Sequence, residues 1–283
     1  MTLTDINTVK RLLGKHGFSF SKALGQNFII DETVCPQMAR LSGISENDGV
    51  IEIGPGIGVL TVELAKKAKK VVAIELDTRL IPVLAETLSE SRNVEVINAD
   101  VLKTDLHALI KEHFADVEKI HVCANLPYYI TSPIIMYLLE ENLPIEAITV
   151  MVQKEAAERL CADVGSRDAG AVTVAVDYYA EAKRLFGVNR NSFMPAPKVD
   201  SEVIKLNVRK EPAVALKDEK FFFNMVRAAF SQRRKTAANS IGSLMGIPKE
   251  KIYAALDAAG LDRSVRAEAL SMKELAALAG ELN

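Results

Sequence analysis

The sequence has few cysteines and no long hydrophobic run, and both absences exclude classes of protein. Its three cysteines, Cys35, Cys123 and Cys161, are far apart, odd in number and outside any C-x-x-C pair. They indicate neither a disulfide framework nor a zinc site, so we expect no bound metal and a reducing, cytoplasmic compartment. No run of about 18 apolar residues occurs, and Met1 to Lys15 lacks the apolar core and cleavage site of a secretory signal. We therefore expect a protein that neither spans a membrane nor is secreted.

The sequence also lacks low-complexity tracts and internal repeats, and its composition is that of a globular protein. Of its 283 residues, 49% are hydrophobic and 25% are charged, which excludes disorder over most of the chain. The length favours one large domain, or one large and one small domain. The net charge of −2 hides a block from Lys183 to Lys235 with thirteen Lys/Arg and five Asp/Glu. Such a block is typical of a solvated surface or of a face that binds a polyanion, and charge alone does not decide between them.

From Gly49 onward, short β-branched runs alternate with helical patterns, which is typical of a parallel sheet. Strands buried on both faces are predicted by nearly continuous apolar runs at 49–53, 71–75, 94–97, 119–123 and 147–152. Helices are predicted by apolar residues at three- and four-residue spacing at 59–67, 79–89, 106–113 and 132–140. We expect Ser132 to cap the last of these and Asp31 to cap a further helix at 32–41.

The regular alternation ends at a loop of Gly, Ser and Arg residues at 164–170. Two prolines in the segment 191–200, NSFMPAPKVD, exclude a helix or a central strand, so a stiff extended loop is expected there. A strand is predicted at 201–208, followed by a polar linker. Helical patterns at 221–230, 252–259 and 272–278 then predict a small all-helical domain at 210–283, which leaves 1–209 as an α/β domain.

A glycine-rich turn, E-I-G-P-G-I-G from Glu52 to Gly58, lies between a predicted strand and a predicted helix. Glycine lets the backbone approach a ligand closely. The dinucleotide pattern G-x-G-x-x-G fails because position 59 is valine, and no Gly-Lys-Ser/Thr follows as in a Walker loop. A tight turn without a ligand is the alternative reading.

Acidic residues follow the next two predicted strands. Glu75 stands 21 residues after Gly54, where doubly wound sheets place an acid that accepts hydrogen bonds from ribose hydroxyls. Asp100 is placed to accept from an adenine amino group, although alone it fits a helix cap or a solvated loop equally. The series of glycine turn, Glu75 and Asp100 indicates an adenosine-bearing cofactor across the carboxyl ends of the strands.

The tetrapeptide Asn125-Leu126-Pro127-Tyr128 follows the fourth predicted strand and resembles the motif of amino-methyltransferases that act on adenine N6. The lone pair of that nitrogen is delocalised into the ring, so the nitrogen is a poor nucleophile. The Asn125 side-chain oxygen and the Leu126 carbonyl can accept its two N–H groups and favour a pyramidal nitrogen. Pro127 fixes the backbone, and Tyr128 offers a ring face to an extruded base. In isolation, these four residues also fit an ordinary loop.

Together, the motifs resemble those of the bacterial small-subunit ribosomal RNA adenine dimethyltransferases, the kasugamycin-sensitivity family, over most of the chain. The matching segments are LGQNFIID at 24–31, EIGPGIGVLT at 52–61, NLPYYITSP at 125–133, FMPAPKVDS at 193–201 and FSQRRKTA at 230–237. The resemblance implies a Rossmann-like class I S-adenosylmethionine-dependent methyltransferase domain with a mostly parallel seven-stranded sheet at 1–209. It implies a small all-helical domain for RNA or subunit contact at 210–283.

The same resemblance implies a reaction. Such enzymes dimethylate N6 of two adjacent adenosines in the 3′-terminal hairpin of 16S rRNA in the assembling 30S subunit. The donor is S-adenosylmethionine, the product is S-adenosylhomocysteine, and no metal takes part. Residues that match the family's cofactor site are Gln26, Asn27, Ile29, Gly54, Gly56, Glu75, Asp100 and Asn125.

The resemblance also implies which residues contact the RNA substrate. Phe193 would be the second stacking ring, so that the target adenine lies between it and Tyr128. Arg233, Arg234 and Lys235 match the family's Q-R-R-K segment and would bind RNA phosphates, which makes affinity depend on salt. A solvated cluster at a helix end is the alternative for these three cations.

Two other functions stay open. One is the related 23S rRNA adenine N6-methyltransferase of the macrolide-resistance type, whose members usually read Asn-Ile-Pro-Tyr followed by Asn or His, whereas this chain reads N-L-P-Y-Y-I-T-S-P. The other is a non-catalytic role in ribosome assembly or transcription. We expect a monomer without membrane contact whose partner is 16S rRNA in the 30S precursor.

Overall fold

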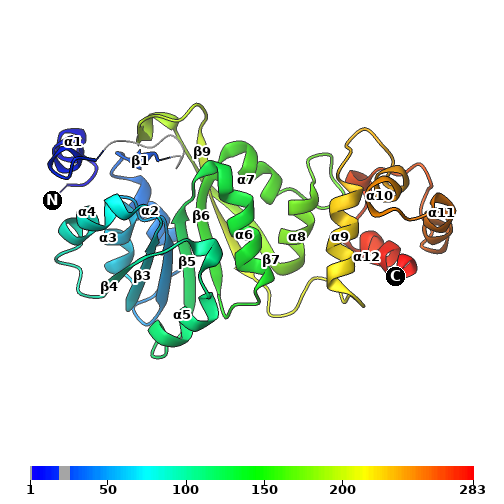
Figure 1. Ribbon diagram of the computed structural model, residues 1–283, viewed down its shortest axis with the longest axis horizontal. Coiled ribbons are helices and arrows are strands. Elements are labelled where there is room, and N and C mark those ends of the chain that lie inside the picture. The colour runs from blue at the N-terminus through cyan, green and yellow to red at the C-terminus, as the bar shows by residue number, and fades with distance from the viewer. Residues whose placement is uncertain (1, 19–25) are drawn as a thin grey trace. The chain divides into compact units, whose positions relative to one another are not determined.

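A seven-stranded sheet organises the first part of the chain. The computed structural model describes residues 2–18 and 26–283. Within them the strand order is β4-β3-β2-β5-β6-β9-β7 (Figure 1). The strands are β2 (Gly49–Ile53), β3 (Lys70–Glu75), β4 (Val94–Asn98), β5 (Ile120–Asn125), β6 (Ala147–Gln153), β7 (Ala180–Val188) and β9 (Ser201–Val208).

The sheet is mostly parallel, as expected. The pairs β2–β3, β3–β4, β2–β5 and β5–β6 are parallel, and β6–β9 is antiparallel. The strand order reverses between β2 and β5, so the loops that leave the carboxyl ends of these two strands turn to opposite sides and form a crevice. This crevice is where an α/β sheet binds its ligand. The six strands predicted in the sequence are confirmed, while β7 was not predicted.

Helices pack along this sheet. They are α2 (Val34–Leu41), α3 (Val59–Ala65), α4 (Ile81–Thr87), α5 (Leu106–His113), α6 (Thr131–Glu140) and α7 (Lys154–Leu160). One buried cluster joins α2 and α3 to four strands, and its members include Cys35, Met38, Leu60, Leu64, Val50, Val71, Cys123 and Met151. Apolar side chains on one helical stripe face the apolar sheet, which accounts for α2, α3, α4, α5 and α6 at the positions that the sequence predicted, whereas α7 was not predicted.

Both predicted helix caps were wrong. α2 begins at Val34 after Thr33, because the Asp31 carboxylate accepts from the Thr33 backbone N–H (3.0 Å) and hydroxyl (2.7 Å) in a turn before the helix. α6 begins at Thr131, directly after the short 3₁₀ turn η4 (Tyr128–Ile130), so Ser132 lies inside the helix.

The N-terminal region adds a helix and a strand that the sequence did not predict. α1 (Ile6–Lys15) is capped by Asp5, whose side chain accepts a hydrogen bond from the Thr8 backbone N–H. The apolar side of α1 packs against α4. The strand β1 (Phe28–Ile29) pairs antiparallel with β8 (Phe193–Met194), which joins the predicted extended loop to the N-terminal segment. Leu24 and Gly25, the start of one matching motif, lie outside the described residues.

Two units divide the chain. The first comprises Met1–Ala157 and Lys183–Val208, and the second comprises Glu158–Ala182 and Arg209–Asn283. The break at Val208 lies one residue from the expected boundary. The segment Glu158–Ala182 was assigned to the α/β domain from the sequence, whereas its contacts place it with the C-terminal helices.

The second unit is built from helices. They are α8 (Ala171–Tyr179), α9 (Glu219–Ala229), α10 (Ala237–Met245), α11 (Lys249–Ala258) and α12 (Met272–Leu282). Its core contains a group of packed rings, namely Tyr178, Tyr179, Phe222 and Phe223. Phe222 and Phe223 are thus core residues. In the described part of the chain, no helix is long and apolar enough to cross a membrane.

Candidate active site

A pocket opens where β2, β3 and β5 end, with about 1070 Å³ of empty space including its mouth. The structure brings together in its lining nearly all residues that the sequence singled out, namely Gln26, Asn27, Ile29, Gly54, Gly56, Glu75, Asp100, Asn125, Leu126, Pro127 and Tyr128. Residues from segments about 100 positions apart therefore meet at one edge of the sheet.

The glycine turn needs glycine for its conformation. Gly54 and Gly56 have φ values of 67° and 63°, a left-handed region that other residues rarely adopt. A Cβ added at Gly54 would meet no atom within 4 Å, whereas one at Gly56 would lie 3.3 Å from the ring of Phe28. The turn therefore presents bare backbone to the pocket, a surface on which the polar end of a ligand can lie closely.

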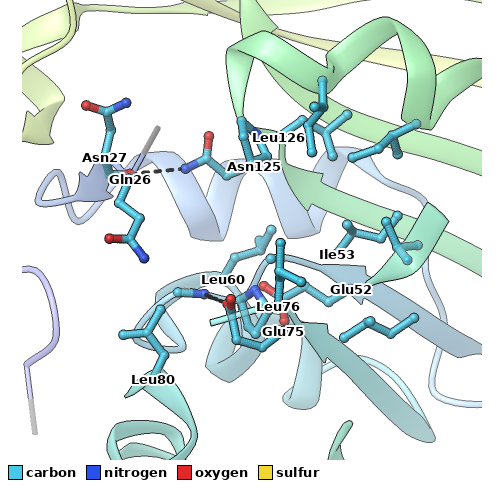
Figure 2. A pocket seen from close by; sticks show the side chains of 18 of the residues that line it. Gln26, Asn27, Glu52, Ile53, Leu60, Glu75, Leu76, Leu80, Asn125 and Leu126 are labelled. Atoms are coloured by element: carbon cyan, nitrogen blue, oxygen red, sulfur yellow. Dashed lines mark hydrogen bonds between the residues drawn. The ribbon is translucent and has the colours of Figure 1, made fainter. Parts of the chain in front are cut away.

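Glu75 is held at the end of β3 by two backbone donors. The Gly56 N–H donates to its Oε2 (3.3 Å), and the Asp77 N–H donates to its Oε1 (2.8 Å), as Figure 2 shows for the first contact. Burial raises the pKa of Glu75, and the two N–H donors oppose this effect. Each oxygen keeps a lone pair, so the carboxylate can still accept hydrogen bonds from two hydroxyls.

Asp77, whose contact with a pocket-lining residue sequence reasoning missed, lies behind the pocket wall. Its Oδ2 accepts from the Gln26 Nε2 at 2.7 Å, and Arg79 donates to both its oxygens. Hydrogen bonds from Arg79 hold the pKa of Asp77 below its usual value. The acid two positions after Glu75 could have been suspected from the run Glu75-Leu76-Asp77. It ties the segment at Gln26 to the second strand-end loop.

Asp100 caps a turn and also lies in the pocket wall. Its Oδ1 accepts from the Leu102 backbone N–H at 3.1 Å, which caps the short 3₁₀ turn η3 (Val101–Lys103). Asp100 and its neighbour Ala99 also line the pocket. Capping therefore fixes the carboxyl at the pocket wall.

Asn125, the last residue of β5, is oriented by the N-terminal segment. Its Nδ2 donates to the Asn27 carbonyl at 3.4 Å (Figure 2). With the amide nitrogen turned toward Asn27, Oδ1 remains as the acceptor of this side chain. Leu126 is anchored by its own N–H, which donates to the Met151 carbonyl at 3.1 Å. The tetrapeptide thus starts from a fixed point on the sheet.

Tyr128 lies in the turn that follows. Its hydroxyl is 2.6 Å from the Ser201 Oγ, and burial raises the pKa of its phenol, so the ring is neutral at physiological pH. The neighbouring Tyr129 is 56% exposed and also lines the pocket. A ring tethered at its hydroxyl end presents its face in a defined direction, which is what base stacking needs.

Phe193 does not lie where we expected it. Its side chain is 3% exposed and belongs to the buried cluster around α2 and α3, and it does not line the pocket. The β1–β8 pairing sets Phe193 opposite Ile29 and directs the ring into this core. The expected sandwich of an adenine between Tyr128 and Phe193 is therefore not what this structure presents.

The three predicted RNA-binding cations belong to the second unit. Arg233, Arg234 and Lys235 are exposed in the connection between α9 and α10, and the Arg233 guanidinium donates to the Arg167 carbonyl at 3.0 Å. Thr236 then caps α10 by accepting from the Asn239 N–H. Over residues 2–18 and 26–283, no group of three or more His, Cys, Asp or Glu side chains could hold a metal ion.

Comparisons with known proteins agree on one family. Residues 17–283 match the family model described as ribosomal RNA adenine dimethylase. The chain is 53% identical to the ribosomal RNA small subunit methyltransferase A of Geobacillus thermodenitrificans, covering 96% of this chain and 94% of that protein. It is 51% identical to the protein of the same name from Bacillus licheniformis, covering 99% and 96%.

Solved structures share the fold. A dimethyladenosine transferase from Plasmodium falciparum aligns with a TM-score of 0.73 and 28% identity, covering 89% of this chain and 95% of that one. The 23S rRNA methyltransferase ErmE aligns with a TM-score of 0.67 and 31% identity, covering 90% and 99%.

Proposed function

The chain belongs to the ribosomal RNA adenine dimethylase family, and from this premise we propose that it dimethylates N6 of two adjacent adenosines in the 3′-terminal hairpin of 16S rRNA in the assembling 30S subunit. Relatives about half identical over nearly their whole length are named for the small ribosomal subunit, which supports 16S over 23S rRNA. The run N-L-P-Y-Y-I-T-S-P supports the same choice.

The pocket fits S-adenosylmethionine, which supplies an electrophilic methyl group on a sulfonium. In our proposal Gly54 and Gly56 lie under its amino-acid end, where the turn offers bare backbone. Glu75 accepts from the ribose hydroxyls, and Asp100 accepts from the adenine amino group. Gln26, Asn27 and Ile29 form the cover of the pocket on the N-terminal side.

The observation that best supports the reaction is the orientation of Asn125. Its amide nitrogen is engaged by Asn27, so its oxygen is the group that can accept an N6–H of the target adenine. The Leu126 carbonyl is proposed as the second acceptor, and both bonds favour a pyramidal nitrogen with its lone pair available. Pro127 restricts the backbone between them and Tyr128, whose ring is proposed to stack on the extruded base.

The second unit is proposed to contact RNA. Arg233, Arg234 and Lys235 lie together on an exposed connection, where guanidinium and ammonium groups can reach phosphates. Because its substrate is ribosomal RNA, we place the enzyme in the cytoplasm, and we propose that it acts as a monomer without a metal.

The test is methylation of 30S particles from cells that lack the enzyme. Wild-type protein should restore dimethyladenosine in 3′ fragments of 16S rRNA, measured by mass spectrometry. Asn125→Ala should lower the rate at least a hundredfold while S-adenosylmethionine still binds, because the lost acceptor acts on the reacting nitrogen, an effect of about 3 kcal/mol. The matched control is Asn47→Ala, which removes an exposed asparagine just before β2, at the edge of the sheet opposite the pocket.

Each alternative has a distinct outcome. Methylation of 23S rRNA and not of 16S rRNA would support the macrolide-resistance type of activity. Assembly rescued by an inactive Asn125→Ala variant, with no methylation by wild-type protein, would support a non-catalytic role. Full activity of Asn125→Ala would contradict the proposed role of its oxygen.

A further inference from the structure

A second carboxyl lies beneath the glycine turn, outside the roles described above. Glu52 is the fourth residue of β2, its side chain is 1% exposed, and it lines the same pocket as Glu75. Figure 2 shows the two glutamates, from the adjacent strands β2 and β3, in the same part of the pocket. A glutamate in the middle of a buried strand costs free energy unless its charge is matched or absent.

The groups that face Glu52 offer it no positive charge. They are Thr61 of α3, Glu75 of β3, Cys35 of α2 and its register partner Cys123 of β5. Burial raises the pKa of both thiols, so both are neutral. Among the described residues, Glu52 Oε2 has no hydrogen-bond partner, and the neutral Thr61 hydroxyl beside the carboxyl only partly opposes the effect of burial on its pKa. An ionised Glu52 would therefore be buried without a counter-ion.

The protonated form of Glu52 avoids this cost. Burial, reinforced by the nearby carboxylate of Glu75, raises the pKa of Glu52 to about 8. At neutral pH the protein without ligand therefore holds a proton on this side chain. Burial also raises the pKa of Glu75, but there two backbone N–H donors oppose the effect by stabilising the carboxylate.

We propose that Glu52 releases its proton when the positively charged methyl donor binds and takes it back when the neutral thioether product occupies the pocket. The inference rests on the proposed function, because it takes S-adenosylmethionine as the occupant. The donor brings a sulfonium cation into a site of low dielectric, where a nearby negative charge attracts it more strongly than in water. The proton passes to solvent on binding, and no other bond changes.

The charge that Glu52 gains when it releases its proton lets the pocket distinguish donor from product. The two molecules differ by one methyl group and one positive charge, and a shape-based pocket discriminates weakly against the loss of a methyl. The amino-acid end is the same in both molecules, so loss of the sulfonium charge removes the one attraction to an ionised Glu52 that differs between them, while the like charge of Glu75 remains. Reprotonation of Glu52 relieves the product complex of this unpaired charge, so the preference for the donor over the product is small at low pH and grows as the pH rises.

Calorimetric titration in buffers of different ionisation enthalpy measures the protons released for each S-adenosylmethionine bound. Wild-type protein should release about 0.9 proton more than Glu52→Gln at pH 7, and about 0.5 more at pH 8. Glutamine keeps the shape without ionising, so the subtraction cancels protons lost by the ligand's α-amino group. Glu63→Gln, which removes a carboxylate paired with Lys66 on α3, should release as many protons as wild type.

The outcomes separate this inference from the proposed function. Equal proton release by wild type and Glu52→Gln, with donor bound by both, would overturn the inference alone. Failure of wild-type protein to bind the donor would contradict the proposed function instead. If Glu52→Gln does not fold, the inference is tested instead on the wild-type protein, by measuring its affinities for S-adenosylmethionine and for S-adenosylhomocysteine at several pH values. The preference for the donor should rise by up to about 100-fold from pH 6 to pH 8, and a constant preference would overturn the inference.

Discussion

Replacing Glu52 by glutamine is expected to stabilise the ligand-free protein at neutral pH, although the side chain is fully buried. The unfolded chain ionises this carboxyl near its ordinary pKa of 4.5, and the folded protein keeps it protonated up to a pKa of about 8. Between these two values folding takes up a proton, so the stability of the wild-type protein falls as the pH rises. Glutamine does not titrate, so the variant escapes this loss.

The size of the stability difference follows from how far the working pH lies above the pKa of Glu52 in the unfolded chain. Each pH unit above the unfolded-state value costs the wild-type protein about 1.4 kcal/mol until the folded carboxyl itself ionises. At pH 7 the variant should therefore be more stable by about 3 kcal/mol, and the difference should vanish as the pH falls to 4.5. Because total stabilities of single domains are about 5–15 kcal/mol, the effect is large enough to measure.

Equilibrium unfolding in urea at pH 5 and pH 7 tests this expectation. The chain contains no tryptophan, so circular dichroism follows the transition. The two units can unfold separately, so hydrogen exchange of the β2 amides reports on the unit that contains Glu52. Glu63→Gln serves as control, since its carboxylate lies partly exposed beside Lys66 and should show no comparable gain.

One result would refute the reasoning. If the difference between wild type and Glu52→Gln is the same at both pH values, whatever its sign, ionisation is not its cause, because packing and neutral hydrogen bonds do not follow pH. A variant that loses stability relative to wild type as the pH rises would show that Glu52 is ionised and stabilised in the folded protein.

Three further predictions concern the other site residues. Glu75→Ala should weaken S-adenosylmethionine binding at least tenfold in calorimetry, because hydrogen bonds to a charged group contribute about 1.5–3 kcal/mol; unchanged affinity would put the ribose assignment in doubt. Alanine at Arg233, Arg234 and Lys235 together should weaken binding to 30S particles and flatten its logarithmic salt dependence by about 2–3; an unchanged slope would place the RNA face elsewhere. Phe193→Ala should lower the free energy of unfolding by about 3–5 kcal/mol, because the ring is buried; methyl transfer lost at unchanged stability would favour a stacking role.

Much of the sheet and its strand-end residues could be predicted because buried parallel strands are continuous apolar runs. The strands Gly49–Ile53 and Ser201–Val208 have the predicted bounds. In a parallel sheet the carboxyl ends meet at one edge, so Glu75, Asp100 and Asn125 had to converge once the strands were assigned. The pocket then required only that the loops leave on the same side.

β7 could not be predicted from its own residues. It spans Ala180–Val188, and most of its side chains are exposed or partly exposed, with charged residues where a buried strand would have apolar ones. Its position next to β9 at the end of the sheet makes it a strand. Conversely, Ala171–Tyr179 is rich in β-branched residues but forms the helix α8, because packing overrides local propensity.

The position of Phe193 could not be predicted for a related reason. A proline-rich loop suggested an exposed ring, but the register of the two-stranded sheet decides which way the ring points, and that sheet has only two residue pairs. Pairing with Phe28 and Ile29 joins residues more than 160 positions apart. A local motif holds no information about such a partner.

The two buried glutamates illustrate how backbone geometry decides the chemistry of identical side chains. Glu75 ends its strand, where the chain turns and directs the N–H groups of Gly56 and Asp77 at the carboxylate. Glu52 lies one residue before its strand ends, where ladder bonds use the neighbouring backbone donors, and its Oε2 finds no partner within the described residues. A carboxyl with donors can hold a charge and accept hydroxyls, and one without donors holds a proton until a cation arrives. In our proposal the same amino acid therefore serves two purposes in one pocket, since Glu75 binds a neutral sugar and Glu52 responds to a positive sulfur.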